Sequence, residues 1–239
     1  MTTPLVSIIL PCYKEEEHLL HSIDELLKVA RGFDFPYELI FVEDYSPDMT
    51  AVILKKLEST LTNARFIYHS GNKGRGAAIK SGFEAARGDI IGYMDVDLEV
   101  SPLYIADMVD ALQTYDVVVG KRSYYYQLSL QSVLRNSLSH FYRRLSRYYL
   151  KHPFTDTEAG YKFFRKKAVL PFFDHIENNH WFWDTEFMTM VHRHKLKVLE
   201  LPVEFVRNNK KQSTVKPVKD SIVYISELKR YRKKLRKGK

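Results

Sequence analysis

Short apolar runs alternate with amphipathic stretches along the first half of the chain. The runs with the length and composition of β-strands cover 5–10, 37–42, 65–69, 89–94 and 116–120. The stretches between them space their apolar residues as a helix with one buried face does, over 15–31, 49–60, 76–87 and 102–114. This alternation is typical of a mostly parallel sheet with helices on both faces. We therefore predict an α/β fold.

The pattern changes after residue 130. It predicts a long amphipathic helix over 131–151, the turn-rich segment DTEAG, a short strand at 160–164, two further helical stretches, a strand at 198–206 and a final helix at 220–237. Neither a repeat nor a linker interrupts the chain before this last helix. We therefore predict one domain over 1–216 and a basic helical extension over 217–239.

The net charge of the chain is concentrated at its C-terminal end. The 239 residues carry 37 Lys and Arg against 29 Asp and Glu, a formal charge of +8. Residues 229–239 (KRYRKKLRKGK) hold eight basic residues and no acidic one, so 1–228 are neutral overall. Tyr224, Leu228, Tyr231 and Leu235 recur four, three and four residues apart in the final helix. A basic amphipathic helix is typical of a membrane surface. A solvated tail, a protein contact and nucleic-acid binding are the alternatives, and we expect no nucleic-acid partner.

The bulk composition restricts the setting of the protein. With 45% apolar and 28% charged residues it matches an ordinary globular protein. Cys12 is the single cysteine, which excludes an internal disulfide and a cysteine-based zinc site. No stretch reaches the roughly 18–20 apolar residues that cross a bilayer, and the first residues lack the basic region of a signal peptide. We expect a cytoplasmic protein that contacts a membrane only peripherally, which leaves room for a separate membrane-spanning partner.

Candidate chemistry follows four of the predicted strands. Ligands in parallel α/β sheets bind beyond the carboxyl ends of the strands. The segments at those ends are rich in carboxylates, glycine and basic residues: PCYKEE, EDYSPD, GNKGRG and DVDLE. The sequence therefore predicts a ligand site at this edge of the sheet.

Asp95 and Asp97 end the fourth predicted strand, two residues apart, so their side chains point to the same side. Two adjacent carboxylates repel each other unless a cation lies between them, and Mg²⁺ or Mn²⁺ commonly bridges such oxygens to substrate phosphates. Glu99 would add a third oxygen ligand. The alternative is that these acids are solvated loop residues or helix caps.

The segments after the second and third strands suit a nucleotide. Glu43 and Asp44 close an apolar strand at the predicted edge, where a carboxylate can accept hydrogen bonds from a base or ribose. The glycine-rich 71–76 segment precedes a helix whose free N–H groups favour anions, and Lys73 and Arg75 add positive charge. Its spacing matches neither a Walker loop nor a dinucleotide fingerprint, and a structural turn is the alternative.

A second group of basic residues follows the fifth strand. Arg122 comes after that strand, and Arg135, Ser139 and Arg143 recur every four residues along the helix predicted at 131–151. Arginines beside a hydroxyl suit a phosphate monoester. A solvated basic helix face is the alternative.

Taken together, these segments resemble family 2 glycosyltransferases with the GT-A fold, and most closely the dolichyl- or polyprenyl-phosphate mannose and glucose synthases. The resemblance runs in order over about residues 5–216. It rests on VSIILPCYKEEE, VEDYSPDMT, NKGRGAAIKSGFEAARGD, MDVDLEVSP, GKRS, DTEAGYKFF, WDTEF and PVEFVRNNKKQSTVK. The sequence departs from the family pattern at Lys14, Glu43 and Tyr45, which replace Asn, Asp and Gly, and by one extra residue after Arg207.

The resemblance implies a role for each matched residue. Those that would bind the nucleotide sugar are Pro11, Tyr13, Glu15, Glu43, Asp44, Lys73, Asp95, Arg207 and Lys216. Asp95, Asp97 and Glu99 would hold the metal, and Arg122, Arg135 and Ser139 the acceptor phosphate. Asp97, Arg122 and Arg135 would be the catalytic residues.

The implied reaction is an inverting, metal-dependent transfer of a hexose from a nucleotide-diphosphate sugar to a polyprenyl or dolichyl phosphate at the cytoplasmic face of a membrane. The metal would neutralise the leaving diphosphate. Three alternatives stay open: the same fold acting on a glycan or other soluble acceptor, a sugar-phosphate nucleotidyltransferase, and a non-catalytic binding module. The paired carboxylates disfavour the last, and the lack of a glycine-rich signature after the first strand disfavours the nucleotidyltransferase.

Overall fold

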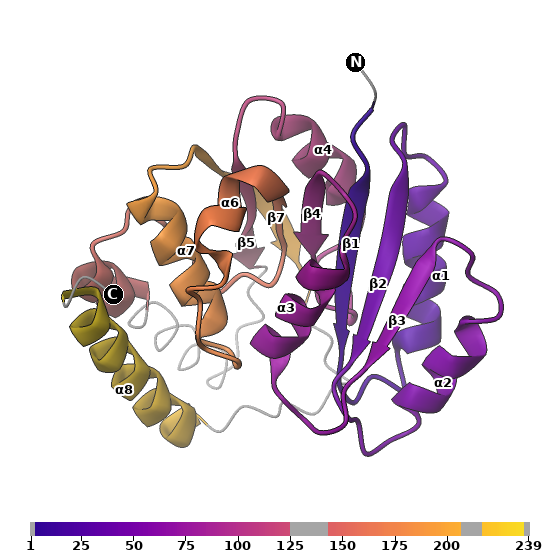
Figure 1. The fold of residues 1–239 in the computed structure, drawn as a ribbon, viewed down its shortest axis with the longest axis horizontal. Coiled ribbons are helices and arrows are strands. Elements are labelled where there is room, and N and C mark those ends of the chain that lie inside the picture. Colours follow the sequence, from indigo (N-terminus) through magenta and orange to yellow (C-terminus); the bar gives the residue numbers. More distant parts are fainter. Residues whose placement is uncertain (1–2, 125–142, 207–216, 237–239) are drawn as a thin grey trace.

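The computed structural model describes residues 3–124, 143–206 and 217–236 (Figure 1). Its strands are β1 (Val6–Cys12), β2 (Tyr37–Glu43), β3 (Ala64–Tyr68), β4 (Ile90–Tyr93), β5 (Val117–Tyr124), β6 (Lys162–Arg165) and β7 (Val198–Phe205). Its helices are α1 (Leu19–Ala30), α2 (Thr50–Leu57), α3 (Arg75–Ala85), α4 (Tyr104–Ala111), α6 (Lys166–Phe173), α7 (Trp183–Arg193) and α8 (Pro217–Arg236). Residues 143–150 are also helical, within the helix predicted at 131–151.

The described strands form one sheet in the order β3-β2-β1-β4-β6-β5-β7. Neighbouring strands run parallel from β3 through β4, and β5 runs parallel to β7. Only β6 is antiparallel to its neighbours, β4 and β5. Since β4 and β5 are both antiparallel to β6, they point the same way, and the predicted mostly parallel α/β sheet is confirmed.

Alternation along the strands divides the core between the two faces of the sheet. In β1, Ile9 joins the cluster that contains the buried residues of α3, α6 and α7, whereas Ile8 and Leu10 join the cluster formed with α1, α2 and α4. All three side chains are at most 2% exposed. Figure 1 shows α3, α6 and α7 in front of the sheet and α1 behind it. Helices therefore cover both faces, as the sequence pattern predicts.

Some element boundaries differ from the prediction in ways that matter for the site. β5 was expected to end at residue 120 but continues to Tyr124, because β7 pairs with it in register from Val117 onward. Arg122 therefore lies within the strand and not after it. β4 ends at Tyr93, so Asp95 and Asp97 belong to the following loop, where Leu98 has a left-handed backbone with φ 52°.

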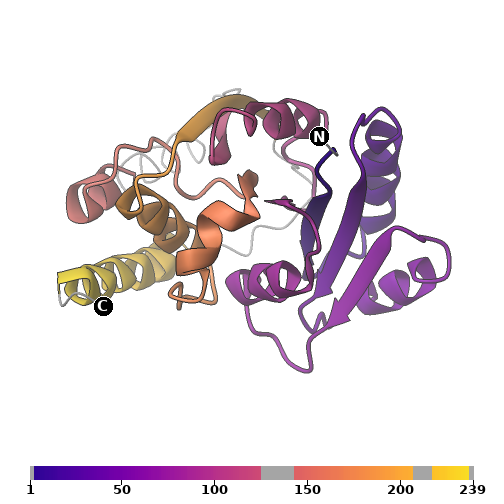
Figure 2. The same cartoon turned by 45° about the horizontal axis from the view of Figure 1, so that its top comes forward.

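The apolar stripe of α8 faces the protein. Leu228 and Tyr231 are 0% and 3% exposed, and they form a cluster with Leu150 and Phe182. Both views place α8 beside the 143–150 helix (Figure 2). Packing against the protein therefore buries this stripe, so a membrane contact of α8 would have to involve its other faces. Among the described helices, none has both the length and the apolar character that a bilayer-crossing segment requires.

Candidate active site

The candidate site lies at the edge of the sheet where the parallel strands end. β1 is central, with β2 and β3 on one side and β4 on the other, so the chain changes direction across the sheet between β1 and β4. Such a switch point is where ligands bind in open α/β sheets. Pro11 lies near the end of β1, and the loops that follow β1 and β4 border this switch point and carry Tyr13, Asp95 and Asp97. β5 points the same way as β4, so Arg122, near the end of β5, also lies toward this edge.

Asp95 is held by an arginine that comes from another element. The Nε of Arg75, the first residue of α3, donates to Oδ1 of Asp95 at 2.8 Å. The side chain of Asp95 is 43% exposed and that of Arg75 is 10% exposed. Loss of hydration raises the pKa of Asp95, the Arg75 guanidinium opposes this rise, and the negative charge of Asp97 adds to it. The two aspartates are therefore close enough to repel each other.

Two of the three predicted metal ligands suit a divalent cation. Asp95 and Asp97 offer carboxylate oxygens, and Mg²⁺ is commonly bound through only one or two carboxylates together with waters and substrate phosphates. Over the described ranges 3–124, 143–206 and 217–236, no three His, Cys, Asp or Glu side chains group as a metal site. The donor chemistry of the aspartate pair thus fits Mg²⁺ or Mn²⁺.

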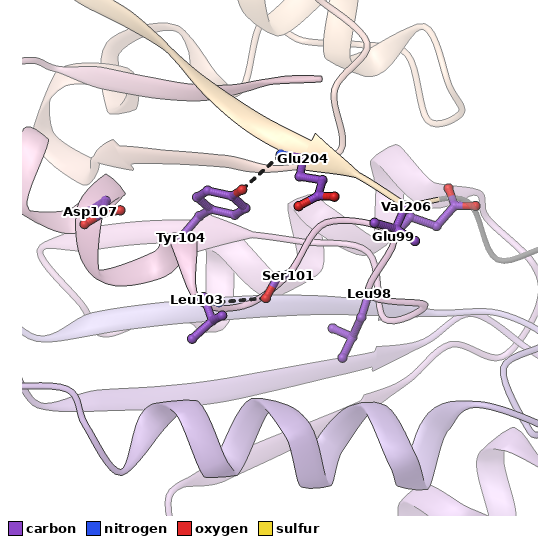
Figure 3. Close-up of a pocket in the computed structure, with 8 residues that line it drawn as sticks. All are labelled: Leu98, Glu99, Ser101, Leu103, Tyr104, Asp107, Glu204 and Val206. Carbon is purple, nitrogen blue, oxygen red and sulfur yellow. Dashed lines mark hydrogen bonds between the residues drawn. The ribbon is translucent and has the colours of Figure 1, made fainter. Parts of the chain in front are cut away.

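Glu99 lines a cavity of about 290 Å³ beside the loop of Asp95 and Asp97, the candidate metal loop (Figure 3). The other lining residues come from the segment before α4, from the first half of α4 and from the end of β7 with the residue after it: Leu98, Ser101, Leu103, Tyr104, Asp107, Glu204 and Val206. The loop is tied to the end of β7, since the Val206 N–H donates to the carbonyl of Glu99 at 2.8 Å. The cavity is therefore lined in part by the residues that directly follow Asp97. Its walls carry three carboxylates, those of Glu99, Asp107 and Glu204.

A buried network of alternating charges lies behind Asp95. Arg75 also donates from Nη1 to Oδ2 of Asp184 at 2.6 Å, while Lys162 and the Tyr93 hydroxyl each donate to Oδ1 of Asp184 at 2.6 Å. Asp184 is 1% exposed and Lys162 is fully buried. Burial opposes ionisation of Asp184, but Lys162 and Arg75 outweigh it and lower the pKa of this carboxyl. The charges run Asp95, Arg75, Asp184, Lys162, so each buried ion has a partner of opposite sign.

The motifs do not reveal this network. In the sequence Arg75 stands out only as a positive charge, and Asp184 and Lys162 lie inside longer matching segments that give them no role. One signal was available. A lysine within the apolar strand segment GYKFF needs a buried anionic partner, because an unpaired ammonium is rarely tolerated in a core. Asp184, in the first turn of α7, looks in the sequence like an ordinary acid at a helix N-terminus.

Asp44 holds the glycine-rich loop against the end of β2. Its Oδ1 accepts from the N–H of Lys73 at 2.8 Å and lies 2.7 Å from Nδ1 of His69, and its Oδ2 accepts from the N–H of Gly74 at 2.8 Å. Asp44 is 3% exposed. Both carboxylate oxygens are therefore engaged in shaping the loop, and the Lys73 side chain projects into solvent from it.

The other predicted nucleotide residues lie near by at the ends of β1 and β2. Glu43 accepts from the N–H groups of Tyr45 and Ser46 at 3.1 and 2.6 Å and is 3% exposed. The N–H of Glu15 donates to Thr50 Oγ1 at 2.9 Å, and the side chain of Glu15 is buried. Pro11 is partly buried, whereas Tyr13 is 39% exposed and open to a ligand.

Arg122 is part of a second ionic cluster. Its Nε and Nη2 donate to the two oxygens of Asp156, each at 2.8 Å, and Nη2 of Arg143 lies 3.6 Å from Asp156. Burial opposes ionisation of Asp156, but the two arginines lower its pKa. Glu200 in turn accepts from the Asp156 N–H at 3.1 Å. The structure thus brings together Arg122 and Arg143, while Arg135, Ser139, Arg207 and Lys216 lie outside the described residues.

Comparison with known proteins identifies the family. A family model for glycosyl transferase family 2 matches residues 7–170, well over half of the chain. The chain belongs to glycosyl transferase family 2. The resemblance drawn from its sequence motifs is therefore confirmed, and the fold is that of a GT-A glycosyltransferase.

Relatives of this family 2 domain include longer proteins. It is 32% identical to glycosyltransferase AglD of Haloferax volcanii over 206 residues, which cover 84% of this chain and 33% of AglD. It is 22% identical to the dolichyl-phosphate beta-glucosyltransferase of Saccharomyces cerevisiae over 221 residues, 84% of this chain and 66% of that protein. The chain thus spans one third of AglD and just under two thirds of the yeast protein.

Solved structures of glycosyltransferases share the fold of this family 2 domain. Glucosyl-3-phosphoglycerate synthase from Mycobacterium tuberculosis, in complex with Mn²⁺, UDP and glucosyl-3-phosphoglycerate, has a TM-score of 0.68 at 16% identity and covers 94% of this chain and 80% of its own. Mannosyltransferase PcManGT from Pyrobaculum calidifontis, in complex with GDP-Man and Mn²⁺, has a TM-score of 0.60 at 15% identity, over 95% of this chain and 70% of its own. At such identities the likeness supports the fold alone.

Proposed function

We propose that this family 2 domain is an inverting, metal-dependent hexosyltransferase that uses a nucleotide-diphosphate sugar as donor and a polyprenyl or dolichyl phosphate as acceptor. One observation carries the proposal. The Asp95–Asp97 loop follows β4 and Arg122 lies near the end of β5, and these two strands end at the same edge of the sheet; Arg143, from the 143–150 helix, approaches the same Asp156 as Arg122. The aspartate loop suits a cation on a diphosphate and the arginine pair suits a phosphate monoester.

The donor would lie along the loops that follow β1, β2 and β4. Tyr13 and the Glu43 region would border the nucleoside, and Asp95 and Asp97 would hold Mg²⁺ or Mn²⁺ at the diphosphate. The bound ion would neutralise charge that develops on the leaving diphosphate. The network through Arg75 and Asp184 keeps the carboxylate of Asp95 in a defined position, which limits the reorganisation needed during reaction.

The acceptor phosphate would bind near Arg122 and Arg143. Asp156 holds both guanidinium groups in place. An oxygen of this phosphate would attack the anomeric carbon of the hexose while the bond from that carbon to the donor diphosphate breaks, which inverts the configuration. The attacking phosphate is already anionic at pH 7, so no strong general base is required. Positioning of two anions then supplies most of the rate enhancement.

The lipid acceptor is supported by relatives with that activity in their names. Several matching proteins are named dolichyl-phosphate beta-glucosyltransferases, including the Dictyostelium discoideum protein, which aligns with 95% of this chain. A lipid-linked acceptor would bring the domain to the cytoplasmic face of a membrane. On α8, Lys229, Arg230, Lys233 and Arg236 are exposed, and each basic residue near an anionic surface contributes about 1 kcal/mol at most.

Glycolipid synthesis tests the enzymatic part of the proposal. The purified chain would be incubated with Mn²⁺ or Mg²⁺, UDP-glucose or GDP-mannose, and a short polyprenyl phosphate, and the product followed by mass spectrometry. We expect glycolipid with one donor, and at least a hundredfold loss in Asp97→Asn. Asp34→Asn, which changes an exposed aspartate remote from the metal loop, is the matched control. Absence of glycolipid with every donor, or equal activity of the two variants, would overturn the proposal.

Vesicle flotation tests the membrane part separately. Because Tyr231 packs in a buried cluster, deleting the end of α8 would disturb the fold, so charge removal is the better variant. Lys229→Gln, Arg230→Gln and Lys233→Gln together should reduce flotation with vesicles that contain 30% phosphatidylserine. Equal flotation of the triple variant and the unchanged chain would contradict a role for the basic face.

A further inference from the structure

Trp181 is a large aromatic side chain left in solvent beside the candidate site. The chain has two tryptophans, and the structure separates them: Trp183 is fully buried in the core, whereas Trp181 is 68% exposed. Both precede or begin α7. The core accounts for Trp183, but it does not account for Trp181.

The position of Trp181 links it to the metal loop. The guanidinium carbon of Arg75 lies 5.7 Å from the centroid of the Trp181 ring, within the range of a cation–π contact. The same guanidinium donates to Asp95 at 2.8 Å. The Arg75 guanidinium therefore lies in contact with both the Trp181 indole and the Asp95 carboxylate, and the side chain of Asp95 is 43% exposed. Both groups that contact this guanidinium are thus partly exposed.

The loop that carries Trp181 is firmly attached. The carbonyl of Asn179 accepts from the N–H of Ala77 in the first turn of α3 at 3.1 Å. The N–H of Asn178 donates to Glu186 at 3.0 Å, and its side-chain amide donates to Glu227 of α8 at 3.1 Å. Contacts with α3, α7 and α8 thus fix the backbone just before Trp181. An exposed aromatic on a fixed backbone is preorganised for binding, because little conformational entropy remains to be lost.

We infer that Trp181 is a stacking platform for the hexose of the donor, an inference that rests on the proposed function. The hexose is attached to the diphosphate that Asp95 and Asp97 would hold through the cation, so it lies within reach of a ring next to Arg75. The nucleoside lies at the other end of the diphosphate, toward β1 and β2. One face of a hexose presents C–H groups, which pack well on the flat apolar face of an indole.

Binding measurements distinguish a hexose contact from a general role in the site. The unchanged chain and the variants Trp181→Phe, Trp181→Ala and Leu170→Ala would be titrated by calorimetry with UDP, UDP-glucose, GDP and GDP-mannose in the presence of Mn²⁺. Leu170 is a 56% exposed apolar residue of α6 and controls for the loss of exposed apolar surface. Thermal unfolding of every variant would be measured in parallel.

The expected result is a difference between sugar-bearing and sugar-free ligands. Trp181→Ala should weaken the preferred nucleotide sugar about tenfold, which corresponds to about 1.4 kcal/mol, and should change the Kd of the matching nucleoside diphosphate less than twofold. Trp181→Phe should lie between the two, and Leu170→Ala should bind as the unchanged chain does. The nucleotide sugar should also change the intrinsic fluorescence of the unchanged chain more than the nucleoside diphosphate does. In Trp181→Phe, where only the buried Trp183 remains, that difference should disappear.

Other results would overturn the inference. Equal weakening of sugar-bearing and sugar-free ligands by Trp181→Ala would indicate a role in shaping the site. Unchanged binding of both, or a raised KM for polyprenyl phosphate alone, would place the hexose elsewhere. If the unchanged chain binds a nucleotide sugar normally, these outcomes reject the stacking role and leave the proposed function standing. If the unchanged chain binds neither nucleotide sugar, the proposed function falls and this inference falls with it.

Discussion

Gly160 is in contact with the candidate metal ligand, and this contact can be tested directly. A Cβ added at residue 160 would lie 2.0 Å from Oδ2 of Asp95, 2.8 Å from its Cγ and 2.7 Å from Nη2 of Arg75. Ordinary contacts of this kind begin at about 3.4 Å. The Asp95 oxygen would therefore have to move by roughly 1.4 Å in Gly160→Ala.

Such a movement should cost activity more than stability. Asp95 is 43% exposed and can rotate away, and Arg75 keeps its second partner, Asp184. We expect the free energy of unfolding to fall by no more than the roughly 1.5–3 kcal/mol that one hydrogen bond to a charged group contributes. A misplacement of about 1 Å can cost about a hundredfold in rate. We therefore expect kcat/KM to fall about a hundredfold, or about 2.7 kcal/mol of transition-state stabilisation.

The assay compares two glycine-to-alanine changes. Gly71→Ala is the matched control, because a Cβ at residue 71 would have no heavy atom within 4 Å. Both variants would be measured for kcat/KM with the preferred donor, for the Mn²⁺ concentration at half-maximal rate, and for urea-induced unfolding. Gly160→Ala should need more Mn²⁺ and turn over more slowly, while Gly71→Ala should match the unchanged chain.

A double-variant cycle shows whether Asp95 carries the effect. If Gly160→Ala acts by displacing Asp95, it should cause little further loss in an Asp95→Ala background, since that background has already lost the carboxylate. The reasoning is refuted if Gly160→Ala stays folded and turns over within twofold of Gly71→Ala. It is also refuted if the two losses add fully in the double variant.

The remaining predictions concern stability. Lys162→Met should lower the free energy of unfolding by about 3–5 kcal/mol because it leaves the buried Asp184 without one partner, and adding Asp184→Asn should recover part of this loss in urea denaturation. Burial, with smaller contributions from neighbouring positive charges, lowers the pKa of His152 from 6.5 to about 4. The unfolded chain therefore binds more protons than the folded chain between these two pH values. The free energy of unfolding should fall by up to about 3 kcal/mol as the pH is lowered from 6.5 to 4. His152→Gln should flatten that fall, and an unchanged pH profile would contradict the assignment. Tyr45 has a left-handed backbone with φ 59° and is 60% exposed. Tyr45→Gly should raise the free energy of unfolding by about 0.5–1 kcal/mol, because glycine adopts this backbone without strain. A lower melting temperature of this variant would contradict the prediction.

Local sequence patterns predicted the sheet and most of its helices because those patterns depend on which side chains are buried. The alternation in β1 sends Ile9 to one face and Ile8 to the other, and the sequence shows this directly. The end of β5 was misplaced because pairing with β7, about eighty residues away, extends the strand to Tyr124. The antiparallel direction of β6 likewise depends on long-range pairing and leaves no local trace.

Motifs predicted where the candidate residues lie in the fold better than they predicted which groups those residues contact. Asp95, Asp97 and Arg122 lie where strand ends meet, as expected. Asp44 shapes the glycine-rich loop by accepting from the backbone N–H groups of Lys73 and Gly74. The sequence does not show this, because every residue type except proline has the same backbone donor. The direction of the apolar stripe on α8 was also open, since an amphipathic helix packs equally well on a protein or on a lipid surface.

The buried network explains why the candidate metal loop depends on residues far along the chain. Arg75 lies at the start of α3, Asp184 at the start of α7 and Lys162 in β6. β6 lies between β4 and β5 in the sheet, which brings Lys162 next to the strand that leads into Asp95. Removing Asp184 would leave two buried cations facing each other, so the orientation of Asp95 and the packing of α7 are coupled. The stretch matched by the family model stops at residue 170, and the carboxylate that pairs these cations lies beyond it. A functional unit defined by that stretch alone would therefore lack the counter-charge that holds its own candidate metal loop.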